Sequence, residues 1–220
     1  MNTKVPDIPS LESEVTVLRP DRGRSPAVYQ IVVNELFDRE GDVYWIDARN
    51  AASSYALFDI APSRELVADI NVARAFTAYQ HHSIIQSLPE LFDEETDLLI
   101  VPNIASLYRD SDVTHSEGLR LLKSAMAILT EIASVFDTAV LVSTLGDDSL
   151  LEHVVSTGDR VLESRQTEMG IVFEGDAFET QIYWQDGYWQ TTIPYWAELL
   201  GTTESLHPHL ATSPPVTVSS

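Results

Sequence analysis

Histidine and serine are the residues of this chain that first suggest metal binding or nucleophilic catalysis. His81 and His82 are adjacent, and His115 and His153 lie elsewhere in the sequence. Adjacent residues of a helix point about 100° apart, so the pair is poorly placed to bind one ion, and we expect structural histidines. Ser25 has no G-x-S-x-G turn around it, so a hydrolase nucleophile is not supported.

The composition predicts one acidic globular domain. The chain has 220 residues, 44% of them hydrophobic, and 34 acids against 13 bases give a formal charge of −21. The acids are scattered along the chain, which favours adaptation to a salt-rich cytoplasm, as in a halophilic archaeon, over a cation-binding loop. Without cysteine, a disulfide or thiolate metal site is excluded. Residues 1–14 carry no apolar leader segment, so we expect a cytoplasmic protein.

The hydrophobic pattern alternates between strand-like and helix-like segments. Apolar residues from Tyr29 to Phe37 recur at the spacing of one helix face, in a helix that Pro26 opens. After Arg160 two segments indicate antiparallel strands joined by a turn. The pattern predicts an α/β fold with a mainly parallel sheet and antiparallel edge strands near the C-terminus. Strands are predicted over 15–18, 43–46, 70–76, 98–101, 139–142, 170–173 and 180–184, with helices over 80–92 and about 116–135.

Three stretches in this order resemble the ATPase core of the archaeal RadA/RecA recombinase family over roughly residues 15–185. Residues 43–47, Val-Tyr-Trp-Ile-Asp, are similar to the family's second core strand. Residues 71–76, Asn-Val-Ala-Arg-Ala-Phe, resemble the family's Tyr-Ala-Arg-Ala-Tyr strand. The third stretch runs from Leu-Leu-Ile-Val at 98–101 through a long helix to the strand that ends at Thr144. The resemblance implies a RecA-like three-layer core of the P-loop NTPase superfamily.

The family's phosphate loop falls on residues 18–25, where the chain departs from the motif G-x-x-x-x-G-K-[ST]. In that motif backbone amides surround the phosphate, the lysine neutralises it, and the hydroxyl binds magnesium. Here Pro20 and Pro26 each remove an amide, and Asp21 adds a negative charge. The resemblance thus implies residual nucleotide binding at the end of the motif at most, and an ordinary turn before the helix is favoured. The motif residues that remain are Gly23, Arg24 and Ser25.

The family's catalytic acids are also replaced under this resemblance. The magnesium-side aspartate falls on Pro102, and the glutamate that polarises the attacking water falls on Arg49. Neither residue can perform the chemistry of the acid it replaces. For Arg49 we favour a solvated or salt-bridged loop arginine over a phosphate contact. We therefore expect no catalytic residue, no metal and no cofactor, although ATP with magnesium stays open as an alternative.

The resemblance places two DNA-facing loops at residues 109–117 and after Thr144, and both are acidic here. Phosphate neutralisation dominates nucleic-acid affinity, so we do not expect independent DNA binding, and nothing indicates a membrane partner. The aromatic residues between 183 and 196 are either packing of a sheet edge or a patch that binds a partner protein.

These observations predict an N-terminal extension over 1–14, a RecA-like core domain over 15–201 and a disordered tail over 202–220. The function that we favour is a catalytically inactive RadA paralog that acts in DNA recombination or repair by binding a protein, such as the RadA recombinase or another repair protein. One alternative is a weak ATPase that uses Arg24 and Ser25, with Asp47 or a partner subunit supplying the missing acid. The other is a scaffold or regulator unrelated to DNA.

Overall fold

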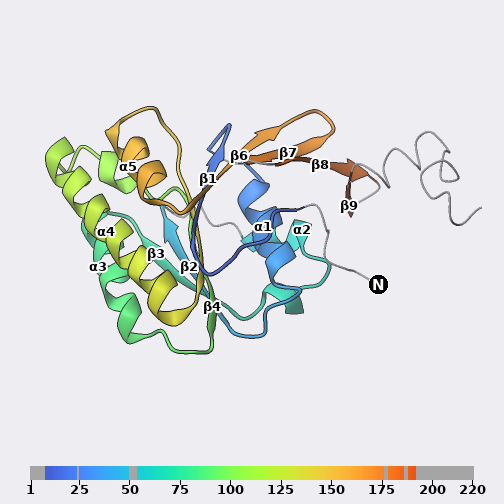
Figure 1. Ribbon diagram of the computed structural model, residues 1–220, viewed down its shortest axis with the longest axis horizontal. Helices are drawn as coiled ribbons and strands as arrows, with labels where there is room; N and C mark the ends of the chain where they lie inside the picture. The colour runs from blue at the N-terminus through green and yellow to red at the C-terminus, as the bar shows by residue number, and fades with distance from the viewer. Residues whose placement is uncertain (1–7, 24, 50–53, 176–177, 186–187, 192–220) are drawn as a thin grey trace, which may run out of the picture.

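A nine-stranded sheet with helices on both faces organises the chain in the computed structural model (Figure 1). The structure describes residues 8–23, 25–49, 54–175, 178–185 and 188–191. The strands are β1 Val15–Pro20, β2 Asp42–Ala48, β3 Ile70–Ala75, β4 Thr96–Val101, β5 Ala139–Ser143, β6 Arg160–Gln166, β7 Gly170–Gly175, β8 Phe178–Gln185 and β9 Tyr188–Thr191.

The strand order is β3-β2-β4-β5-β1-β6-β7-β8-β9. Strands β1 to β6 form the parallel part of the sheet, in which every neighbouring pair runs parallel. Strands β7, β8 and β9 follow beside β6, and each is antiparallel to the strand before it. The predicted α/β class, with a mainly parallel sheet and antiparallel strands near the C-terminus, is confirmed.

Helices cover the two faces of the sheet in separate groups (Figure 1). Helices α1 (Ala27–Glu35) and α2 (Ser54–Ile60) pack on one face, where Ile31 and Trp45 lie in the same buried cluster. Helices α3 (Ala78–Ser87), α4 (His115–Phe136) and α5 (Ser149–Thr157) pack on the other, where Leu129 and Val154 share a second cluster. The protein thus has three layers with a hydrophobic core on each side of the sheet.

Helix α4 shows how closely local sequence determines an element. Thr114 caps the helix, because its side chain accepts a hydrogen bond from the amide of Glu117 at 3.3 Å. The helix ends at Asp137, which adopts the left-handed conformation with φ 54°. The helix predicted over 116–135 is confirmed and is one residue longer at each end.

The helix predicted over 80–92 is wrong at both ends. Helix α3 begins at Ala78, after the capping side chain of Thr77, and ends at Ser87. A short 3₁₀ turn, η2, follows over Leu88–Glu90, with Pro89 inside it. Proline has no amide to donate and disfavours helical geometry at the preceding residue, so the α-helix stops before it.

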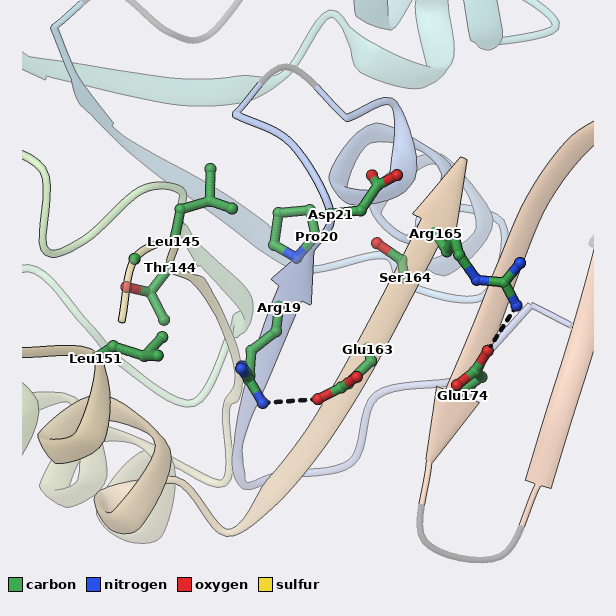
Figure 2. A pocket seen from close by; sticks show the side chains of 11 residues that line it. Arg19, Pro20, Asp21, Thr144, Leu145, Leu151, Glu163, Ser164, Arg165 and Glu174 are labelled. Carbon is green, nitrogen blue, oxygen red and sulfur yellow. Dashed lines mark hydrogen bonds and ion pairs between the residues drawn. The ribbon is translucent and has the colours of Figure 1, made fainter. Parts of the chain in front are cut away.

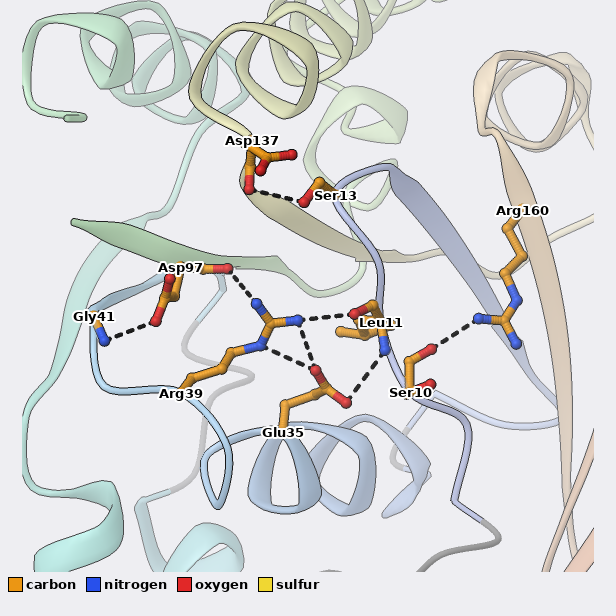
Figure 3. Close-up of polar contacts among 9 residues, drawn as sticks. All are labelled: Ser10, Leu11, Ser13, Glu35, Arg39, Gly41, Asp97, Asp137 and Arg160. Carbon is orange, nitrogen blue, oxygen red and sulfur yellow. Dashed lines mark hydrogen bonds and ion pairs between the residues drawn. The ribbon is translucent and has the colours of Figure 1, made fainter. Parts of the chain in front are cut away.

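Residues 8–14 of the predicted N-terminal extension pack against the domain. Ile8 and Leu11 are buried in the cluster beneath α1. The amide of Leu11 donates to Glu35 at 3.2 Å, and Arg39 donates to the Leu11 carbonyl at 2.9 Å (Figure 3). Arg39 also pairs with Glu35 at 2.7 Å, so a buried ion pair holds this segment in place.

Parts of the predicted organisation lie outside the described residues. They are the start of the N-terminal extension (1–7), Arg24, the end of the predicted core (192–201) and the predicted tail (202–220). In the predicted aromatic patch, the backbone of β8 and β9 is described, whereas the side chains over 183–196 are not.

Candidate functional site

The carboxyl ends of β1 and β5 form the natural binding edge of this sheet. The chain leaves β1 for α1 on one face, and it leaves the neighbouring β5 for α5 on the other face. In open α/β sheets ligands bind outside the carboxyl ends of the strands where successive connections diverge in this way. The predicted phosphate loop begins at this edge.

Two amides, one in the loop between β1 and α1 and one at the start of α1, are hydrogen-bonded within the protein. The amide of Asp21 donates to the Ser164 carbonyl at 2.9 Å, and Ser25 accepts from the amide of Ala27 at 3.3 Å. Gly23 does not adopt a positive φ, and a Cβ at this position would meet Leu145 at an ordinary 3.4 Å. Pro20 and Pro26 have no amides, so the described part of the loop lacks two of the donors that a phosphate loop uses.

Pro102, which the resemblance places at the magnesium-binding aspartate, lies in a turn after β4. Asn103, which follows Pro102, has a positive φ of 52°. Its amide donates to the Ser143 hydroxyl at 2.9 Å, and the next amide, of Ile104, donates to the Ser143 carbonyl at 2.9 Å. The turn after β4 is thus hydrogen-bonded to the end of β5.

Arg49 is a salt-bridged loop arginine, as favoured from the sequence. Its guanidinium pairs with Asp110 and reaches the carbonyl of Ser106 at 3.5 Å. Nearby, Arg74 lies 3.5 Å from the fully buried Asp47 at the end of β2. Arg49 and Arg74 are therefore each paired with a carboxylate.

The two loops predicted to face DNA are joined to each other. Arg109 donates two hydrogen bonds to Asp148, at 2.7 and 2.9 Å. These bonds hold the pKa of the Asp148 carboxyl well below its usual range. Gly146, at φ 121°, lies directly under the guanidinium, because a Cβ there would meet Arg109 at 2.7 Å. The basic residue of this region is consequently neutralised within the protein.

His81 is a structural histidine, as expected. It is fully buried, and its Nδ1 lies 2.8 Å from the hydroxyl of Tyr108. Burial, with a smaller contribution from His82, lowers the pKa of His81 to about 4. Within the described ranges there is no group of three or more histidine, aspartate or glutamate side chains placed to hold a metal ion.

A cavity of about 240 Å³ lies at the carboxyl ends of β1, β5 and β6, and we call it the β1–β6 cavity (Figure 2). Two ion pairs line it: Arg19 with Glu163 at 2.6 Å, and Arg165 with Glu174 at 3.0 Å. Sequence reasoning missed this site, because Arg19 and Glu163 are separated by 144 positions and meet only through the parallel pairing of β1 with β6.

The opposite end of the sheet presents a different surface, the β3 edge. Strand β3 pairs with β2 and is the last strand on that side. Three apolar side chains on or near it are exposed: Val72 by 44%, Phe76 by 62% and Tyr79 by 49%. An open hollow of about 530 Å³ lies beside Phe76, between the end of β3 and α3.

No protein-family model matches this chain, and no curated protein is significantly similar to it. The resemblance to the RadA/RecA family therefore rests on the sequence motifs. In the part of the chain that the structure describes, none of the helices combines the length and apolarity that crossing a membrane requires.

Proposed function

We propose that this protein is a RecA-like, non-hydrolysing paralog of the RadA recombinases that acts in DNA recombination or repair by binding a partner protein. The proposal combines a core of P-loop type with lost phosphate chemistry and an exposed strand edge. The observation that carries it is the β3 edge with its exposed apolar side chains.

The arrangement of β1, the following loop and α1 supports the RecA-like part of the proposal. A strand that runs through a loop into a helix at the carboxyl edge of a parallel sheet is the setting of a P-loop. The parallel core followed by antiparallel strands β7, β8 and β9 agrees with the architecture that the resemblance implies.

The groups at that edge support the proposed loss of hydrolysis. The loop amides of Asp21 and Ala27 are already engaged, and the position expected for the magnesium ligand is Pro102. Arg49, at the position of the water-polarising acid, is a cation in a salt bridge. A phosphoryl-transfer site needs a bound magnesium ion and a group that orients the nucleophile; Pro102 cannot hold the ion, and a salt-bridged arginine cannot act as the base.

The β3 edge is suited to an extended peptide. An edge strand offers backbone amides and carbonyls to one more strand, while pockets beside it select particular side chains. Phe76 is large enough to anchor an interface, and the hollow beside it provides room for a side chain of the partner. The occupant that we propose is an extended segment of the RadA recombinase with at least one apolar side chain.

Charge sets a further condition on the partner. The formal charge of −21 makes a basic or neutral segment a better fit than an acidic one. Molar salt screens this attraction, so the apolar contacts at Phe76 must supply most of the affinity under salt-rich conditions.

The test is binding of the purified protein to the RadA recombinase of the same organism in molar KCl, by calorimetry. Phe76→Glu is compared with Val135→Glu, because Val135 at the end of α4 is exposed to a similar extent, 65% against 62%. We expect native protein and Val135→Glu to bind equally, and Phe76→Glu to bind at least about tenfold more weakly.

A lack of association between native protein and RadA would remove the recombination part of the proposal. If both substitutions weaken binding to RadA equally, the β3 edge is not the contact surface. If RadA does not bind but another protein does, with the same sensitivity to Phe76→Glu, the protein is a scaffold or regulator outside recombination.

A further inference from the structure

The β1–β6 cavity is formed by side chains that share one face of the sheet. Arg19 lies directly opposite Glu163 in the pairing of β1 with β6, and Glu163 lies opposite Glu174 in the pairing of β6 with β7. Residues opposite each other point to the same face, here the face that α5 covers. Leu151 of α5 forms part of the wall.

Like charges directly opposite each other in a sheet are unfavourable, so the pair of Glu163 and Glu174 needs an explanation. Each glutamate is compensated by an arginine, Arg19 for the first and Arg165 for the second. Each ion pair joins one guanidinium nitrogen to one carboxylate oxygen. All four side chains are between 39% and 58% exposed, so further donors and acceptors of both pairs can reach a ligand.

The balance of charge argues against an anionic ligand. Asp21 also lines the cavity, where it accepts from the amide of Gln166 at 3.1 Å. Arg22 pairs with Asp21 at 3.3 Å, so each of the three carboxylates has one guanidinium partner. The site therefore has no excess positive charge to attract a phosphate. A zwitterionic ligand would have to compete with two existing ion pairs.

We propose that the β1–β6 cavity binds a neutral polyhydroxylated ring, either a free monosaccharide or the sugar of a nucleoside. A hydroxyl group both donates and accepts, so it can bond to a carboxylate and a guanidinium without breaking the ion pair between them. Pro20, Leu145 and Leu151 provide apolar wall for the carbon-bound hydrogens of the ring. The volume of about 240 Å³ lies below the roughly 300 Å³ at which drug-sized ligands begin to fit.

This inference is independent of the β3 edge and goes beyond the proposed function. It assigns a small-molecule site to a chain whose phosphate-binding residues are replaced. The cavity also borders Leu145 and Gly146, in the loop after β5 that Arg109 bonds through Asp148, so a ligand there would contact both β1 and this loop.

The test is an NMR titration of the native protein with D-glucose, D-ribose, adenosine and ATP. We expect one or more of the first three to bind with a dissociation constant on the order of 1 mM, with amide shifts at residues 19–21 and 163–165. The free sugars and adenosine distinguish the two sources of the ring. ATP should bind no more tightly than adenosine.

Glu163→Gln keeps the size of the side chain and removes the like charge opposite Glu174, so the fold should persist. It should weaken sugar binding about tenfold, because a hydrogen bond to a charged acceptor is lost. Glu152→Gln, on the exposed side of α5 and away from the cavity, should bind as the native protein does. No shift with any sugar or adenosine, equal binding by Glu163→Gln, or tighter binding of ATP than of adenosine would each overturn the proposal.

Discussion

Asp148 accepts two hydrogen bonds from Arg109, at 2.7 and 2.9 Å, and also caps α5 by accepting from the amide of Leu151 at 3.0 Å. One carboxylate thus connects the 3₁₀ turn η3 (Leu107–Arg109), the loop after β5 and the start of a helix. The contact also neutralises the arginine in the first of the two loops predicted to face DNA.

The Arg109–Asp148 pair should stabilise the fold above acidic pH. The folded pKa of Asp148 is lowered, so its contribution is present above about pH 4, the usual pKa of aspartate, and is lost as pH falls through the lower folded pKa. Asp148→Asn keeps a helix-capping side chain and removes the charge. We expect it to lower the free energy of unfolding by about 1 kcal/mol at pH 7, a value reduced by partial exposure.

Urea unfolding of native protein and Asp148→Asn between pH 7 and 2 checks this. The difference between them should shrink as pH falls. A difference that is independent of pH would show that the ion pair is not its source.

His81 should make the fold sensitive to mild acid. Its folded pKa is about 4 and its ordinary value 6.5, so the unfolded chain takes up the proton first. The contribution to stability is complete above pH 6.5 and declines as pH falls toward 4, by about 3 kcal/mol in total. The double variant His81→Leu/Tyr108→Phe, which removes both partners of the buried hydrogen bond, should flatten this decline.

The matched control is His115→Gln, because His115 lies on the surface at the start of α4. It should retain the decline of the native protein between pH 6.5 and 4. If the double variant retains it as well, His81 is not the responsible group.

Breaking the largely buried pair of Glu35 and Arg39 should cost the fold more than breaking any exposed pair. Arg39→Met leaves the carboxylate of Glu35, 4% exposed, without its charged partner and releases the Leu11 carbonyl. We expect a loss of about 3 kcal/mol in the free energy of unfolding. The same change at Arg120, 71% exposed and 3.9 Å from Glu117, should cost less than about 0.5 kcal/mol.

A double variant separates charge from packing. Glu35→Leu/Arg39→Met leaves no unpaired charge and should be less destabilised than Arg39→Met alone, as measured in urea. A double variant as unstable as the sum of the single changes would contradict this account.

The surface charge predicts that salt stabilises the protein. With a formal charge of −21, screening removes repulsion among carboxylates. The midpoint of thermal unfolding should rise between dilute buffer and molar KCl. A midpoint that stays constant or falls would argue against adaptation to a salt-rich cytoplasm.

Most of the parallel core was predictable, because its segments are apolar and periodic. The strand predicted over 98–101 is confirmed within β4, and α4 is confirmed nearly to its ends. Strand β6 was missed because its sequence, Arg-Val-Leu-Glu-Ser-Arg-Gln, has two adjacent apolar residues and a polar remainder. Its place beside β1 comes from tertiary pairing, which local propensity does not encode.

The candidate binding edge was predictable only where it depends on local sequence. The departures from the phosphate-loop motif that the resemblance implies could be seen in the sequence, since Pro20, Asp21 and Pro26 are local features. The β1–β6 cavity was not, because its ion pairs join β1 to β6 and β6 to β7 across the sheet. Helix α2 was likewise missed, because its seven residues are too few to show a helical period of apolar residues.

The most direct test of the claim that phosphate chemistry has been lost is titration of the native protein with a fluorescent ATP analogue and magnesium in molar KCl. The account predicts no binding below about 1 mM, because Pro20 and Pro26 supply no amides and the amides of Asp21 and Ala27 are already hydrogen-bonded within the protein. Micromolar binding that Ser25→Ala abolishes would contradict it and would establish a nucleotide site at the end of β1.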